Sequence, residues 1–314
     1  MTHIDSMYNN FVWFNGVVED RNDPLKLGRC RVRCLGYHTE NKSLLPTEDL
    51  PWAMPIMPIT SASVSGIGQS PVGPVEGTWV IGFFRDGDSC QEPVIMGTMV
   101  GIPEEKANPI IGFNDPSGKY PLEDSLGEAD TSRLSRNEKI DETIVKLKKD
   151  DIDEMTLPTG IDSPDTVTEP ETQYNAQYPL NRVIETEGGH VIEVDDTEGS
   201  ERLHIYHKSG TFIEIHPDGS MVRKVVGTNY EVRAGDESIH LKGVYNITVE
   251  GDSKIYTKGN VIMKTGGDVT HAVTDGNYTL NVKKKITMTA GDGASSIVMD
   301  DSSIKETSGS IMLN

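Results

Sequence analysis

Glycine recurs every eight residues near the end of this 314-residue chain, and no other feature constrains the fold as strongly. Each of these glycines marks a corner, because a residue without Cβ adopts a positive φ or fits where a side chain has no room. The seventh corner comes nine residues after the sixth, which we interpret as a one-residue bulge. The predicted corner glycines are Gly227, Gly235, Gly243, Gly251, Gly259, Gly267 and Gly276.

Apolar residues occur at two positions of equal parity within the octads, the fourth and sixth residues after glycine. Positions of equal parity point to one face of a strand, so each octad predicts a short strand with inward apolar residues. After the bulge the apolar set moves along the chain and stays in phase. The predicted shaft core consists of Ile239, Leu241, Ile247, Val249, Ile255, Met263, Leu280 and Val282.

A period of eight residues is too short for one chain to enclose its own core, since a coil of a single-chain parallel β-helix needs about 18 residues or more. Three chains that wind about one axis close the core and leave no exposed strand edges. The period therefore predicts a homotrimer with an intertwined triple-stranded β-helix over residues 227–314. Ile311, Met312 and Leu313 would form an apolar triangle at its end, which predicts a docking site for a tip protein.

The charge balance excludes some classes of function. The chain has 49 acidic and 29 basic residues and a formal net charge of -20, which argues against a nucleic-acid-binding protein. It has no apolar run of about 18 residues and no signal-peptide pattern, so we expect a soluble chain that is not exported by the usual routes. Three cysteines without a CxxC pair predict free thiols in a reducing compartment.

The sequence before the octads divides into three parts. In 1–120, strand-like runs at 12–18, 29–35, 78–84 and 93–99 are separated by turn residues and predict a small all-β barrel or sandwich. Residues 121–175 carry 15 acidic and 6 basic residues and predict an acidic linker. Residues 176–226 alternate polar and apolar residues between glycine turns, which predicts an antiparallel meander leading into the shaft.

One short helix is predicted inside the acidic linker. Ser135 and Glu138 have the spacing of a capping box, and Ile140, Ile144 and Leu147 follow at helical spacing. Such a helix buries little by itself, so we expect it to dock on a neighbouring element or on another copy of the chain.

Several long segments resemble the central spike protein of contractile-tailed phages of the T-even type, a relative of the VgrG spikes of type VI secretion. Segments 13–38, 58–84 and 112–121 are similar to that family's N-terminal OB-fold domain. Segment 185–215 resembles the stretch that leads into the spike, and the glycine octads resemble its triple-stranded β-helix. The resemblance implies a virion protein at the centre of the tail baseplate. Its OB domain would bind a trimeric hub protein, and its shaft would puncture the host outer membrane.

The chain departs from the T-even pattern between the OB fold and the shaft. The T-even protein carries a lysozyme domain there, whereas this chain has only the acidic linker of 55 residues, 121–175. A lysozyme fold needs roughly 150 residues to bury a core around its carboxylate pair. We therefore expect a non-enzymatic spike, with a PAAR-type tip protein at the C-terminal end and no cofactor.

The candidate chemical groups favour structural roles. Glu193, Asp195 and Asp196 lie in one strand-like run, and we interpret them as solvated charges, because adjacent strand residues point to opposite faces. His204 and His207 point to opposite faces of a strand and do not predict a metal site. His190 is expected to pack or form hydrogen bonds at a strand start. Cys30 and Cys34 are expected to be small buried residues, Cys90 has no evident partner, and Gly68 and Gly73 fail the dinucleotide spacing.

Two alternatives remain open at this stage. A trimeric β-helical tailspike that depolymerises polysaccharide has a similar shaft, but it predicts a cleft lined by aromatic residues and paired acids. The octad region offers only Tyr230, Tyr245, Tyr256 and Tyr278. A spike of a type VI-like secretion or tailocin system would have the same fold.

Overall fold

The computed structural model describes residues 11–139, 154–158, 164–249 and 251–307. The chain divides into two compact units, and each is described by itself. The first unit contains Met1–Asp153 and Glu169–Asp236, and the second contains Glu154–Thr168 and Glu237–Asn314. None of the described helices is long and apolar enough to cross a membrane.

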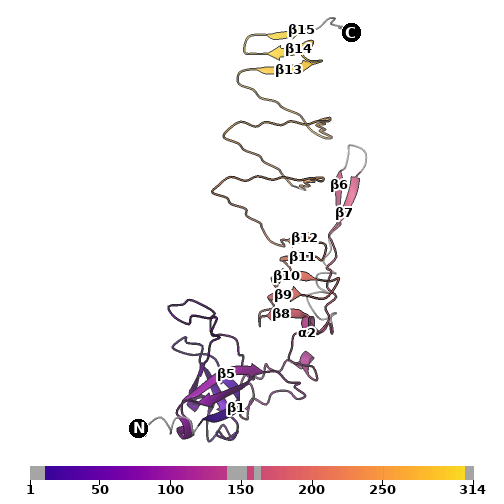
Figure 1. Ribbon diagram of the computed structural model, residues 1–314. Helices are drawn as coiled ribbons and strands as arrows, with labels where there is room; N and C mark the ends of the chain where they lie inside the picture. Colours follow the sequence, from indigo (N-terminus) through magenta and orange to yellow (C-terminus); the bar gives the residue numbers. More distant parts are fainter. Residues whose placement is uncertain (1–10, 140–153, 159–163, 250, 308–314) are drawn as a thin grey trace. The chain divides into compact units, whose positions relative to one another are not determined.

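The first unit begins with a closed five-stranded barrel (Figure 1). Its strands are β1 (Val12–Asp20), β2 (Cys30–Cys34), β3 (Trp52–Pro55), β4 (Trp79–Phe84) and β5 (Pro93–Met99). They close in the order β1-β2-β3-β5-β4, and β3 and β5 form the parallel pair. This arrangement confirms the predicted OB-type barrel in a nearly all-β chain, and short 3-10 helices at Thr47–Asp49 and Gly87–Ser89 occupy two of its loops.

The barrel core is apolar and tightly packed, with buried side chains that alternate along β4 and the first half of β1, whereas the second half of β1 is buried on both faces. Gly82 lies where the barrel has no room for a side chain, because a Cβ built there would come within 2.0 Å of the Val94 carbonyl oxygen and 2.7 Å of the Phe14 ring. Cys30 and Cys34 are buried as expected, and burial raises the pKa of the Cys30 thiol to about 11. Such thiols stay protonated and unreactive near neutral pH.

A buried ion pair fixes the loops of the barrel. Arg33 and Glu19 are fully buried, and Arg33 Nε lies 2.6 Å from Glu19 Oε1. The Thr47 hydroxyl and the backbone N–H of Phe113 also donate to the Glu19 carboxylate, each at 2.8 Å. Arg33 in turn donates to the Thr39 carbonyl at 2.6 Å. Loops far apart in the sequence therefore converge on one charge pair, as a buried charge requires.

The capping prediction for the acidic segment was wrong in position. The structure has a 3-10 helix at Glu123–Ser125 and one helical turn, α2 (Arg133–Arg136). Ser132 caps this turn by accepting a hydrogen bond from the Leu134 backbone N–H, and Asn137 ends it in a left-handed conformation. Ser135 is therefore inside the turn rather than at its cap. Ile140, Ile144 and Leu147 lie outside the described residues.

The first unit also contains a five-stranded antiparallel sheet in the order β12-β11-β10-β9-β8, which confirms the predicted meander. Its strands are β8 (Asn181–Glu185), β9 (Val191–Asp195), β10 (Arg202–Tyr206), β11 (Phe212–Ile215) and β12 (Met221–Lys224). Glycine turns join most of them, and Gly189, Gly210 and Gly219 have positive φ.

The second unit contains two short sheets. The strands β6 (Glu154–Pro158) and β7 (Pro164–Thr168) form a hairpin within the predicted linker. The strands β13 (Ile286–Ala290), β14 (Ser295–Met299) and β15 (Ile304–Thr307) form an antiparallel sheet near the C-terminus. Between them, residues 237–249 and 251–285 run as an extended zigzag without strand pairing (Figure 1).

We predict that Gly82→Ala destabilises the barrel by about 1–3 kcal/mol, because the new methyl group overlaps the Val94 carbonyl. The matched control is Gly97→Ala on β5, where a Cβ has nothing within 4 Å. Thermal unfolding followed by tryptophan fluorescence measures the difference. Equal melting temperatures for the two variants would contradict the packing described here.

Candidate assembly site

The predicted shaft residues lie on the surface of the isolated chain. Ile255 is 92% exposed and Met263 is 82% exposed, and the other predicted core residues of the octads are exposed as well. Extended apolar surface of this kind is typical of a site that another surface covers. The remaining members are Ile239, Leu241, Ile247, Val249, Leu280 and Val282.

The corner glycines behave differently from the prediction within the single chain. Gly276 has a φ of +139°, but the six earlier corners have no positive φ, and a Cβ built on any of the six would meet nothing within 4 Å. The chain by itself therefore gives no reason for glycine at those six corners. Any crowding there has to come from outside the chain.

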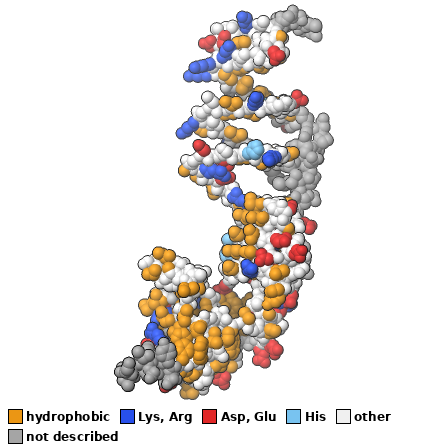
Figure 2. Space-filling view, viewed as in Figure 1, with side chains coloured by type: hydrophobic (Ala, Val, Ile, Leu, Met, Phe, Trp, Pro, Cys, Tyr) orange, Lys and Arg blue, Asp and Glu red, His pale blue; other side chains and the backbone are white. Residues whose placement is uncertain are grey.

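The β8–β12 sheet has one apolar face that is open to solvent. Ile184, Ile192, Leu203, Ile205 and Ile213 alternate with buried residues, and each is between 39% and 65% exposed. Figure 2 shows hydrophobic side chains gathered on this part of the chain. The sequence alternation predicted the strands but not which face the chain itself covers.

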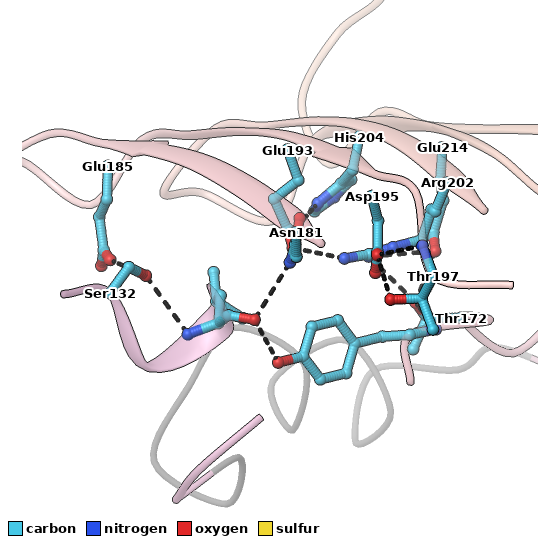
Figure 3. Close-up of polar contacts among 12 residues, drawn as sticks. Ser132, Thr172, Asn181, Glu185, Glu193, Asp195, Thr197, Arg202, His204 and Glu214 are labelled. Carbon is cyan, nitrogen blue, oxygen red and sulfur yellow. Dashed lines mark hydrogen bonds and ion pairs between the residues drawn. The ribbon is translucent and has the colours of Figure 1, made fainter. Parts of the chain in front are cut away.

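The opposite face of the sheet buries a cluster of charged side chains (Figure 3). Glu193 Oε2 lies 2.5 Å from Arg202 Nη2, and Glu193 Oε1 lies 2.6 Å from His204 Nδ1. Arg202 Nη1 lies 3.3 Å from Glu214 Oε1, and Asn181 donates to Glu193 at 2.9 Å. These groups come from β8 to β11 and form one continuous network.

The prediction that Glu193 and Asp195 are solvated was wrong. Glu193 is 1% exposed and Asp195 is 3% exposed. They are two residues apart, so they share the face that the chain covers, whereas Asp196 points away and stays exposed. The sequence contains a pattern that indicates this burial. Arg202, His204 and Glu214 lie at matching parity on the neighbouring strands and so face the two acids.

A strap formed by α2 and residues 172–174 covers this polar cluster. The Leu134 carbonyl accepts hydrogen bonds from the Tyr174 hydroxyl at 2.7 Å and from the Asn181 amide at 3.1 Å. The Thr172 hydroxyl lies 2.5 Å from Glu214 Oε1, and Ser132 donates to Glu185 at 2.9 Å. The Leu134 side chain is buried against Val191, Tyr206 and Phe212. Part of the acidic segment is therefore docked on the sheet.

The polar cluster is suited to holding structure and not to chemistry on a substrate. Its ion pairs are fully buried, so no substrate reaches the carboxylates. His204 points into the cluster, while His207 is exposed and its ring lies 4.5 Å from that of His190. Among the described residues, no group of three or more His, Cys, Asp or Glu side chains could hold a metal ion.

The described residues combine an OB-type barrel, a sheet with an open apolar face and the glycine octads. Residues 36–179 match the family model described as the Gp5 N-terminal OB domain. The chain is 43% identical to protein Gp5 of Vibrio phage KVP40 over 81% of its own length. It is 40% identical to the pre-baseplate central spike protein Gp5 of Enterobacteria phage T4 over 65% of its own length.

These matches support a T4-like baseplate central spike protein. The chain spans 66% of the length of the Vibrio phage protein and 36% of the T4 protein.

We predict that Glu193→Gln lowers stability by about 3–5 kcal/mol at pH 7, because it leaves Arg202 and His204 buried beside a neutral group. Burial by itself raises the pKa of Glu193, but the His204 hydrogen bond and the charge of Arg202 together hold this pKa below its ordinary value. The stabilisation is therefore present at neutral pH and is lost as pH falls through the lowered pKa.

The measurement is the melting temperature of the wild-type protein and of the Glu193→Gln variant between pH 7 and pH 3. The gap between wild type and Glu193→Gln is expected to narrow towards low pH. Glu198→Gln, in the exposed turn after β9, is the matched control and should leave the melting temperature within about 2 °C. A constant gap at every pH would contradict the assignment of an ionised, stabilising Glu193.

Proposed function

We propose that this chain is the central spike of a contractile phage tail baseplate, in which three copies form a needle that punctures the host outer membrane. The observation that carries the proposal is the exposure of the octad residues, for example 69% at Ile247 and 92% at Ile255. Covering these residues inside a threefold shaft removes a large apolar surface from water. Each fully buried aliphatic side chain contributes roughly 1.5–3 kcal/mol.

The extended course of residues 237–249 and 251–285 supports the same proposal. No strand is assigned in these residues, although the octads have strand periodicity. Neighbouring copies would supply the missing hydrogen-bond partners along each octad. They would also supply the crowding that makes glycine necessary at Gly227, Gly235, Gly243, Gly251, Gly259 and Gly267, where the single chain leaves open space.

The open apolar face of the β8–β12 sheet extends this surface towards the octads along the sequence. Ile192, Leu203 and Ile213 lie on it, and the strap covers only the opposite, polar face. Three such sheets that face one axis would enclose an apolar prism with charged groups outside it.

The proposed function includes partners at both ends. The relative from phage T4 is named as a pre-baseplate central spike protein, which supports a place for this chain at the centre of the tail baseplate, with a trimeric hub protein bound to the barrel. We place a PAAR-type tip protein on Ile311, Met312 and Leu313, which lie outside the described residues. Binding of a tip protein that survives deletion of residues 311–314 would refute this placement.

We also propose that the chain has no muralytic activity. The acids in the β8–β12 sheet are enclosed in ion pairs, and the acidic segment has 55 residues in place of a lysozyme domain. The alternative of a polysaccharide depolymerase is not favoured, because the relatives include a protein named as a central spike. Incubation of the purified chain with peptidoglycan and host polysaccharide is expected to release no sugar fragments, and release of fragments would refute the non-enzymatic proposal.

We predict that Ile247→Asp prevents trimer formation or lowers the association constant at least tenfold, because it places three uncompensated charges in the shaft core. Thr248→Asp, the next residue on the opposite face of the strand, is the matched control and should leave the trimer intact. Sedimentation or light scattering measures the mass. A trimer of unchanged melting temperature for Ile247→Asp would show that the inward assignment of the octads is wrong.

A further inference from the structure

A long loop of the barrel carries no charge. The uncharged loop (56–75) makes up most of the connection from β3 to β4, which ends with residues 76–78, and the sequence contains no Asp, Glu, Lys, Arg or His between Asp49 and Glu76. Its apolar side chains point to solvent, with Ile59 at 103%, Val64 at 59% and Ile67 at 65% exposure. A charge-free apolar surface is unusual on a chain with a net charge of -20.

The uncharged loop is held in one shape by its own contacts. The backbone N–H of Ile67 donates to the Val64 carbonyl at 2.9 Å, and that of Gln69 donates to the Ser61 hydroxyl at 2.9 Å. A Cβ on Gly68 would lie 2.3 Å from the Ser61 hydroxyl oxygen. At the base, a Cβ on Gly28 would lie 2.1 Å from the Pro71 carbonyl oxygen. A preformed loop loses little conformational entropy when it binds.

A second charge-free surface lies on the outside of the same barrel. It is the aromatic face, formed by outward side chains of the first half of β1 and of β4: Trp13, Asn15, Trp79, Ile81 and Phe83. Val17 and Glu19 have the same parity on β1 but are buried and do not contribute to this surface. Trp13 is 50% exposed and Trp79 is 45% exposed, and the rings of Trp13 and Phe83 lie 6.2 Å apart. Figure 2 shows that hydrophobic side chains are dense over the barrel. Exposed aromatic rings of this kind are typical of the core of protein interfaces.

We propose that the uncharged loop of one copy binds the aromatic face of the next copy, so that three barrels close a ring. This inference rests on the proposed trimer. A closed ring requires two different, complementary surfaces on each chain, and one barrel carries both. Each copy has a net charge of -20, so two copies repel each other over most of their surfaces. Two copies can approach each other without this electrostatic repulsion where both of the facing surfaces are free of charge.

In such a ring, the barrels would form a second set of contacts between the three copies, in addition to the contacts in the shaft. Loop and face can both be buried without leaving an unpaired charge, since neither carries one. The other possible occupant of either surface is an apolar surface of a different protein. The experiment below separates these two occupants.

The test is crosslinking between copies of the full chain. Val64→Cys and Ile81→Cys are combined with Cys90→Ser, since Cys30 and Cys34 are buried. A short bismaleimide is added to the trimer, and covalent dimers and trimers are resolved on a denaturing gel. We expect most chains to be crosslinked between copies. A second pair, Ile67→Cys with Asn15→Cys, repeats the test if the first variant folds poorly.

The controls are Val64→Cys alone and Val64→Cys with Leu44→Cys, which is 75% exposed in another loop of the barrel. Both should give at least fivefold less crosslinked product. A trimer by light scattering that yields no crosslinks between copies beyond the controls would overturn this inference and leave the shaft intact. A monomer by light scattering would instead refute the proposed trimer itself, and the ring with it.

Discussion

An eight-residue repeat cannot enclose a core within one chain, and this constraint determines the rest of the structure. Eight extended residues span about 26 Å, which is enough for one face of a narrow prism and too little to return around it. The octads accordingly run unpaired in residues 237–249 and 251–285, with their apolar side chains in solvent. The parts of the chain that fold without a partner are those whose apolar side chains are buried by other residues of the same chain.

The chain itself covers one face of the β8–β12 sheet and leaves the other face open to solvent. The strap docks on the face that carries Glu193, Arg202 and His204, and it leaves the isoleucine-rich face free. A buried ion pair gains little net stability, but its geometry selects one partner and one register. The strap is bonded to the face that carries the polar network, through Leu134 and Thr172. The apolar face needs only size and shape complementarity, which other copies of the same surface would provide under the proposed trimer.

Some of this fold could be predicted from the sequence, and some could not. The four runs predicted in 1–120 coincide with β1, β2, β4 and β5 to within about two residues, because alternation and turn residues act locally. The short β3 and its parallel pairing with β5 depend on barrel closure, which no local pattern reports. The burial of Glu193 and Asp195 differs from the prediction because charge predicts exposure on average, whereas their burial depends on Arg202 and His204, which lie opposite them on the neighbouring strand β10. Ser135 has the capping-box spacing to Glu138, whereas Ser132, which caps the turn, has Ser135 three positions on and so lacks the acidic partner of the motif.

The unpaired octads have a consequence for the timing of folding. A barrel folds at a rate set by its own chain, but a shaft that acquires strand partners only from other chains folds at a rate that depends on concentration. Under the proposed trimer, chains made at low copy number would pass through a long period with a folded barrel and an open apolar tail. Synthesis of many copies close together in time and space would then be as much a requirement for the shaft as its sequence.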